Sequence, residues 1–202
     1  MTTFQNVAEF LPEGEKGVAK IKHIEVSEAD ASFSRMRQAA TGGREQAVRP
    51  GKYAQLFVGN QLMMSDTQME RDTNRDFVRQ ARGNVLIAGL GVGMILVPIL
   101  KKANVGTVLV VEKHQDVIDL VSPSFKEAIE DDRLVILRED IFTMELEKSW
   151  SFDTIYFDIW PNITTRNLKE MAVLHKRFRP SLARNGWMDS WLHDELRGGG
   201  YR

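Results

Sequence analysis

Short apolar runs alternate with helix-like segments over the C-terminal two thirds of the chain. The runs at residues 85–88, 108–111, 134–137, 154–157 and 186–191 have the length and composition of buried strands. Between most of them, apolar residues at helical spacing predict helices at 94–102, 115–121, 125–129 and 164–178. Strands that alternate with helices form parallel βαβ units with right-handed crossovers, so the pattern predicts an α/β fold with a doubly wound, mostly parallel, Rossmann-like sheet.

The N-terminal third shows a different pattern. Partial alternation predicts a short strand at 18–26, and two β-prone runs at 52–58 and 61–65 flank Gly59-Asn60, which is typical of a hairpin turn. Residues 34–51 contain glycine, proline and four arginines, and they predict a mobile basic loop that is either solvated or a lid over a ligand. We therefore divide the chain into an N-terminal extension at 1–65 and a Rossmann-like domain at 66–202.

One helix is predicted between the hairpin and the first parallel strand, at 65–82. Ser65 and Gln68 have the spacing of a capping box at its start. Three polar residues recur every four positions along one side of it: Asp66, Glu70 and Asn74. This side either faces solvent or completes a pocket above the sheet.

A glycine-rich loop, VLIAGLGVG, follows the first parallel strand and contains Gly89, Gly91 and Gly93. Glycine there lets a ligand approach the backbone, and Glu112, at the end of the next strand, can accept hydrogen bonds from both ribose hydroxyls. Asp140 is a candidate acceptor for an adenine amino group, or else a solvated loop acid. The spacing is G-x-G-x-G rather than the G-x-G-x-x-G of dinucleotide folds, which favours S-adenosylmethionine, a cofactor without phosphate.

Asp158 ends the fourth predicted strand, at the carboxyl edge where open α/β sheets bind ligands. Its carboxylate can orient an attacking amine or accept a proton from it, or it caps the following helix. Trp160 offers an aromatic face to a planar or cationic substrate, or packs in the core. Glu70 and Asn74 are the other predicted substrate-binding residues, whereas His175 is interpreted as a surface residue.

These motifs resemble the successive cofactor motifs of class I methyltransferases over residues 84–191: VLIAGLGVG, Val110-Val111-Glu112, Glu139-Asp140-Ile141 and FDTIYFD. The resemblance implies a bound S-adenosylmethionine. Upstream, LFVGNQLMMSDTQMERD is similar to the hairpin that precedes this fold in spermidine synthases. Two short segments also resemble motifs of guanidinoacetate methyltransferase: Met69-Glu70-Arg71 and Asp158-Ile159-Trp160-Pro161.

The sequence departs from these families at identifiable positions. Val92 and Pro161 stand where spermidine synthases carry an acid inside the glycine loop and a second acid after the catalytic aspartate. The antiparallel sixth and seventh strands of methyltransferases do not follow the fifth predicted strand, so the sheet is expected to be truncated there. We therefore expect part of the substrate wall to come from the N-terminal segment or from another subunit.

Composition narrows the class of protein. The 202 residues are 43% hydrophobic and 27% charged, which is typical of a globular domain with one core. A net charge of −1 gives no strong signal for nucleic acid. The chain has no cysteine, and no metal site is predicted. No apolar run of about 18 residues and no leader pattern is found, so we expect a cytoplasmic protein without a membrane partner.

Together these features predict an S-adenosylmethionine-dependent methyltransferase that acts on a small-molecule acceptor. An amine or guanidine is the preferred acceptor, because Asp158, Glu70 and Asp66 would supply negative charge. Aminopropyl transfer from decarboxylated S-adenosylmethionine is an alternative, and a non-catalytic cofactor-binding or scaffold protein is another. Self-association into a homo-oligomer is left open.

Overall fold

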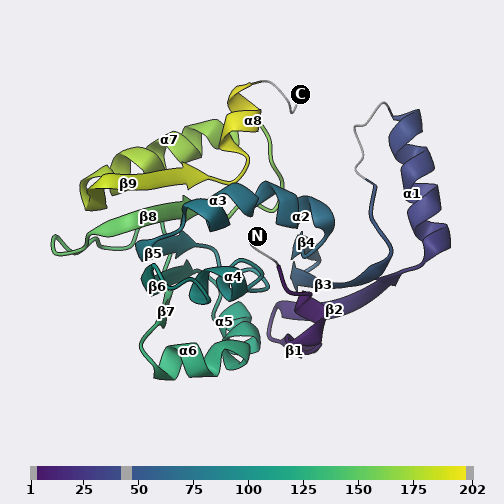
Figure 1. Cartoon of the computed structure of the whole chain (residues 1–202), viewed down its shortest axis with the longest axis horizontal. Coiled ribbons are helices and arrows are strands. Elements are labelled where there is room, and N and C mark those ends of the chain that lie inside the picture. The colour runs from purple at the N-terminus through teal and green to yellow at the C-terminus, as the bar shows by residue number, and fades with distance from the viewer. Residues whose placement is uncertain (1–3, 42–46, 199–202) are drawn as a thin grey trace.

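The computed structural model describes residues 4–41 and 47–198, which form two sheets connected by short helices (Figure 1). The larger sheet is parallel and has the order β7-β6-β5-β8-β9. Its strands are β5 (Gly83–Ala88), β6 (Val105–Glu112), β7 (Leu134–Arg138), β8 (Phe152–Phe157) and β9 (Leu182–Ser190). The predicted doubly wound α/β fold is confirmed, and all five predicted strands are present.

Helices cover both faces of the parallel sheet. Val85 and Ile87 of β5 belong to one core cluster, with α4 (Leu96–Leu100) and α5 (Gln115–Val121). Leu86 and Ala88 belong to a second cluster, with α7 (Asn167–Phe178) and α8 (His193–Arg197). The short α6 (Lys126–Glu130) precedes β7, whereas residues 139–151 join β7 to β8 without a helix. No helix in the described part of the chain has the length and apolar content needed to span a lipid bilayer.

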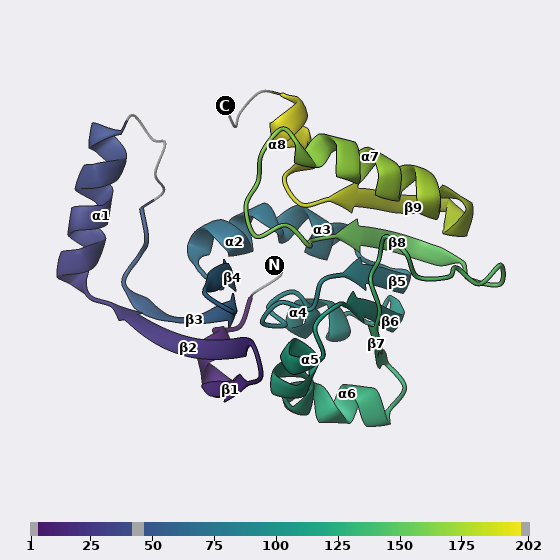
Figure 2. The same ribbon diagram turned by 180° about the vertical axis from the view of Figure 1, so that it is seen from behind.

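The N-terminal residues form a separate antiparallel sheet of β1 (Gly14–Lys16), β2 (Ala19–Val26), β3 (Gly51–Val58) and β4 (Gln61–Ser65). The predicted hairpin is β3–β4, and Gly59 at its turn has φ +58°. The predicted strand at 18–26 is β2. In Figures 1 and 2 this sheet lies beside α2, α4 and α5, close to one edge of the parallel sheet.

Helix α1 (Glu28–Ala40) replaces the first part of the predicted basic loop and projects away from both sheets (Figure 2). Ser27 caps it, because its side chain accepts a hydrogen bond from the Asp30 amide while Asp30 accepts one from the Ser27 amide. The loop prediction was therefore wrong for residues 34–40. The part of the predicted loop at 42–46 lies outside the described residues.

The predicted single helix at 65–82 is two helices, α2 (Gln68–Thr73) and α3 (Arg75–Gln80), which meet at Asn74. The predicted capping box of Ser65 and Gln68 was wrong, since α2 begins after Thr67 and has no side-chain cap. The three polar residues of the predicted side nevertheless share one environment. Asp66, Glu70 and Asn74 are all buried, so the alternative of a solvated helix face was wrong.

Asp66 joins three segments at the junction between the sheets. Its carboxylate accepts hydrogen bonds from the Ala54 amide of β3 at 2.7 Å and from the Val7 amide of η1 (Val7–Glu9) at 2.9 Å. Arg71 pairs with it at 2.7 Å. Because Asp66 is 0% exposed and its charge is already paired, the expectation that it attracts a substrate was wrong.

Candidate functional site

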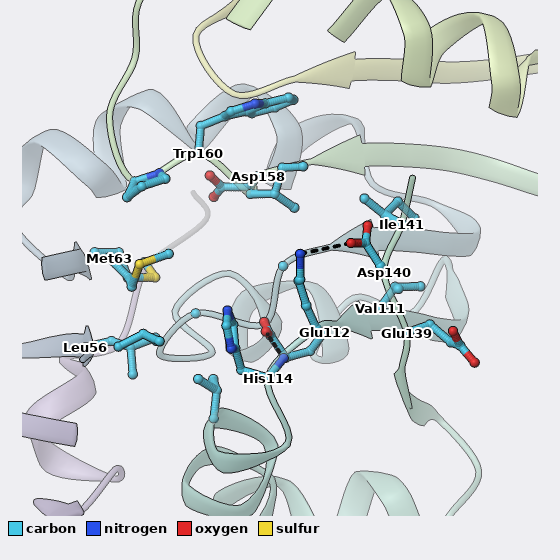
Figure 3. A pocket seen from close by; sticks show the side chains of 18 of the residues that line it. Leu56, Met63, Val111, Glu112, His114, Glu139, Asp140, Ile141, Asp158 and Trp160 are labelled. Carbon is cyan, nitrogen blue, oxygen red and sulfur yellow. Dashed lines mark hydrogen bonds and ion pairs between the residues drawn. The ribbon is translucent and has the colours of Figure 1, made fainter. Parts of the chain in front are cut away.

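A cavity of about 250 Å³ lies at the carboxyl edge of the parallel sheet (Figure 3). Residues that follow β5, β6, β7 and β8 form one side of it, and apolar side chains of the β3–β4 hairpin form the other: Leu56, Val58, Met63 and Met64. The expectation that the N-terminal segment contributes to the wall is therefore confirmed. Six of the predicted site residues line this cavity: Gly89, Gly91, Glu112, Asp140, Asp158 and Trp160.

The backbone of the glycine loop requires glycine at two positions beside the cavity. Gly89 has φ +97°, and a Cβ there would lie 2.1 Å from the Asp158 carbonyl oxygen. Gly91 has φ +54°, and its Cβ would lie 2.1 Å from Sδ of Met64. The same sulfur accepts a hydrogen bond from the Val92 amide at 3.3 Å. Met64 thus covers the loop, and a ligand that contacts Gly91 requires a new rotamer of this flexible side chain.

Gly93 has a different neighbour from the other two glycines. It has φ +71°, and a Cβ there would lie 2.5 Å from Cε2 of Phe125. Phe125 belongs to the 3₁₀ helix η2 (Ser122–Phe125) and packs in the core cluster beside α5. Gly93 does not line the cavity, so packing accounts for glycine at this position.

Glu112 holds the glycine loop against the end of β6. Its Oε2 accepts a hydrogen bond from the Leu90 amide at 3.0 Å, and its Oε1 accepts one from the His114 amide at 2.8 Å. The residue is 8% exposed and lines the cavity (Figure 3). Each carboxylate oxygen can accept more than one hydrogen bond, so the position allows contacts with a pair of hydroxyls.

Asp140 lies on the opposite side of the cavity from the hairpin (Figure 3). Its Oδ1 accepts a hydrogen bond from the Phe142 amide at 3.0 Å, and its Oδ2 pairs with Nζ of Lys113 at 3.0 Å. The Phe142 amide, followed by Lys113, lowers the pKa of the Asp140 carboxyl below its ordinary value. Asp140 is therefore an acceptor whose orientation is already fixed.

Asp158 and Glu70 form an acidic end of the site. Burial raises the pKa of Asp158 to about 7. Burial, followed by the charge of Asp158, raises the pKa of Glu70 to about 8, and a hydrogen bond from the Ser65 backbone opposes this shift. Both carboxyls therefore take up protons as the pH falls through the neutral range, and a nearby cation would favour their ionised forms.

Asn74 lies one helical turn after Glu70 and is 0% exposed. Its Nδ2 donates a hydrogen bond to the Glu70 carbonyl oxygen at 3.0 Å. Its Oδ1 is buried and has no hydrogen-bond partner among the described residues. Such an orphaned oxygen is uncommon in a folded protein, and it can accept a hydrogen bond from a ligand N–H or a water molecule. Neither Glu70 nor Asn74 is among the residues that line the cavity itself.

Trp160 follows Asp158 and is buried in the cavity wall. Its Nε1 donates a hydrogen bond of 2.6 Å to Glu170 of α7, which fixes the indole ring. Sequence reasoning missed Glu170, which also lines the cavity. It missed the methionines of β4 too, although two consecutive methionines beside a predicted ligand loop could have indicated an adaptable wall.

His175 is not the surface residue that we predicted. It is half-buried on α7, and Nε2 lies 2.8 Å from Oγ of Ser190. Its ring centroid is 5.7 Å from that of Phe157 in the core. Burial, followed by neighbouring His193, lowers the pKa of His175.

No protein-family model matches the sequence, and no curated protein does. Among solved structures, the chain is similar to spermidine synthase from Thermotoga maritima, with a TM-score of 0.54 and 16% sequence identity. A spermidine synthase in complex with the transition state analogue AdoDATO gives a TM-score of 0.53 and 15% identity. Each similarity covers 89% of this chain and 55% of the solved chain. The chain has a spermidine-synthase-like fold.

The sequence motifs predict a class I methyltransferase-like fold with a resemblance to spermidine synthases, and that resemblance is confirmed at the level of the fold. The chain spans 55% of the length of the two spermidine synthases. An S-adenosylmethionine-dependent methyltransferase from Clostridium acetobutylicum gives a TM-score of only 0.39, with 15% identity over 58% of this chain and 46% of its own. At these identities the spermidine-synthase-like fold alone is established, and the reaction depends on the site.

Proposed function

We propose that this chain is an S-adenosylmethionine-dependent methyltransferase that acts on a small amine or guanidine. The observation that carries the proposal is one cavity with two chemically different ends. Glu112 and His114 lie at one end, Asp158 and Trp160 lie at the other, and Gly89 of the glycine loop packs against the Asp158 backbone (Figure 3). The first end suits a nucleoside and the second suits a cation.

The residues at the nucleoside end suit S-adenosylmethionine. Gly89 and Gly91 leave bare backbone on the loop, Glu112 would accept hydrogen bonds from the ribose, and Asp140 would accept one from the adenine amino group. When bound, the cofactor supplies an activated methyl group. Met64 would rotate away from Gly91 to admit it, and the apolar hairpin would exclude water from the reacting atoms.

The residues at the acidic end would bind and orient the acceptor. Ionised Asp158 would attract a protonated amine or guanidine and would accept the proton that the nitrogen must lose. Its pKa of about 7 suits this exchange near neutral pH. A bound cation would favour the ionised form of Glu70, which would add negative charge from behind the cavity wall, and the Oδ1 of Asn74, also behind the wall, would accept a hydrogen bond from a water molecule. Trp160 would offer its fixed ring to a flat cation.

The cofactor assignment can be tested by calorimetric titration with S-adenosylmethionine, its decarboxylated form and NAD. We expect S-adenosylmethionine to bind, and Glu112→Gln to weaken binding at least ~10-fold because each lost charge-assisted hydrogen bond contributes about 1.5–3 kcal/mol. Glu145→Gln is a matched control on an exposed residue and should bind as the wild type does. Tight binding of NAD with no binding of either sulfonium compound would overturn the assignment.

The reaction can be tested with methyl-labelled cofactor and a panel of small amines and guanidines. We expect label to reach one of them, and Asp158→Asn to slow transfer by about 10²–10⁴-fold while the cofactor still binds. Asp131→Asn, at an exposed turn, is the matched control. If the cofactor binds and no acceptor is labelled by wild type or variant, a non-catalytic binding protein becomes the better description.

Aminopropyl transfer is a second candidate, because the spermidine-synthase-like fold includes the N-terminal sheet as well as the parallel one. Two positions argue against it. Val92 is fully buried, and Pro161 lines the cavity, so neither place offers the acid expected from that family. The two reactions can be distinguished by the donor that is consumed and the product that it leaves. Methyl transfer converts S-adenosylmethionine to S-adenosylhomocysteine, whereas aminopropyl transfer converts the decarboxylated form to methylthioadenosine.

A further inference from the structure

Three potential metal ligands meet on the α7 face of the sheet, outside the cavity. His175 comes from α7, Asp189 from the end of β9, and His193 is the first residue of α8. One ligand atom of each lies within 4.8 Å of the other two, and all three side chains are partly buried. None of them lines the cofactor cavity. No short sequence motif indicates this cluster, because its members come from three elements.

The side chains already face one another. Nδ1 of His193 lies 2.8 Å from Oδ1 of Asp189, and the rings of His175 and His193 meet edge to face with centroids 4.9 Å apart. Nε2 of His175 lies 2.8 Å from Oγ of Ser190, the residue that follows Asp189. Two imidazoles and a carboxylate therefore converge from different directions on a small volume.

We propose that His175, Asp189 and His193 bind a divalent transition-metal ion, with Zn²⁺ as the preferred ion. Imidazole nitrogen and carboxylate oxygen are both common zinc ligands, and three such groups leave the fourth tetrahedral position to water or to Ser190. Zinc–ligand bonds are about 2.0–2.2 Å, which requires ligand atoms nearer to one another than 4.8 Å. Rotations of the three side chains would bring the ligand atoms to this spacing, and the metal would displace the proton between His193 and Asp189 into solvent.

Such a site would fasten α7 and α8 to the end of β9. Phe157 on the neighbouring strand β8 is fully buried and packs 5.7 Å from His175, so α7 has little freedom to move away. The end of β9, which carries Asp189, and the start of α8, which carries His193, would lose most of their remaining freedom when the ion binds. Because the ion binds the folded chain and not the unfolded chain, adding it should raise the melting temperature.

The experiment uses the full chain without a purification tag, after treatment with a chelator. Calorimetry with Zn²⁺ should give one site per chain, and Co²⁺ should give the visible absorption of a tetrahedral ion. His175→Gln, His193→Gln and Asp189→Asn should each weaken binding by more than the ~10–100-fold typical of residues that only support a ligand. The chain has four histidines and no cysteine, so His23→Gln and His114→Gln are matched controls that should bind normally.

A second readout does not depend on whether the variants fold. In the wild type, imidazole nitrogen resonances should shift on addition of Zn²⁺ for two of the four histidines, and assignment should give His175 and His193. Stoichiometric binding by the wild type that survives in His175→Gln and His193→Gln would overturn the proposal. So would Zn²⁺ shifts confined to His23 and His114, or no binding by the wild type. Because none of the ligands lines the cofactor cavity, these results do not depend on the proposed methyl transfer.

Discussion

Replacing Glu70 with glutamine should make the chain more stable at alkaline pH. Glu70 is 7% exposed, and burial together with the charge of Asp158 raises its pKa from 4.5 to about 8. The folded chain therefore holds this proton more tightly than the unfolded chain does. The resulting stability is fully present below pH 4.5 and is lost as the pH rises through about 8.

The size of this loss follows from the two pKa values of Glu70. One pKa unit corresponds to about 1.4 kcal/mol, so the rise from 4.5 to about 8 corresponds to at most about 5 kcal/mol above pH 8. Relaxation and water entry reduce the penalty of a buried charge, so we expect about 2–5 kcal/mol. Glutamine cannot ionise, so Glu70→Gln avoids this loss of stability. The titration of Asp158 contributes to the pH dependence of stability in both the wild type and the variant.

Urea unfolding at about pH 5, 7 and 9 measures the effect. The free energy of unfolding of the wild type should fall across this range, and that of Glu70→Gln should fall less. Glu145→Gln, on an exposed residue, should follow the wild type at every pH. An equal difference in unfolding free energy between wild type and Glu70→Gln at about pH 5 and at about pH 9 would contradict the raised pKa of Glu70.

Three further predictions concern the loop, the junction and the acidic end. Gly91→Ala should lower the free energy of unfolding by about 1–2 kcal/mol, because φ is +54° and the new Cβ meets Met64, and Met64→Ala should recover part of that loss in urea unfolding. Asp66→Asn should lower it by about 3 kcal/mol, since the charge of Arg71 loses its partner, whereas the exposed Asp72→Asn should change it little. Methyl transfer should accelerate as the pH rises through about 7, where Asp158 ionises, and a flat pH–rate profile would contradict that role.

The parallel sheet could be predicted from sequence because its strands are covered on both faces. Val85, Leu86, Ile87 and Ala88 are all 0% exposed, which gives a continuous apolar run rather than an alternating one. Parallel strands all end at the same edge, so residues that follow successive strands had to come together. For that reason Gly89, Glu112, Asp140 and Asp158 could be assigned to one site without a structure.

Other features depend on contacts that leave no local signal. Helix α1 buries only Ala31 among its described residues, and its larger apolar side chains, Phe33 and Met36, are exposed, so its apolar positions do not mark a side that faces the core. The position of Met64 over Gly91 depends on how the hairpin lies against the parallel sheet. The half-buried state of His175 depends likewise on Ser190 and His193, which come from other elements.

The β3–β4 hairpin supplies one wall of the cavity, yet its attachment depends on Asp66, which lies outside the cavity. Any molecule held between the hairpin and the parallel sheet would contact both, and would favour the arrangement in which the two pack together. Its measured affinity would then include the free energy of keeping them together. A substitution at Asp66 would thus weaken binding without touching the bound molecule, and saturating ligand would protect the hairpin from proteases.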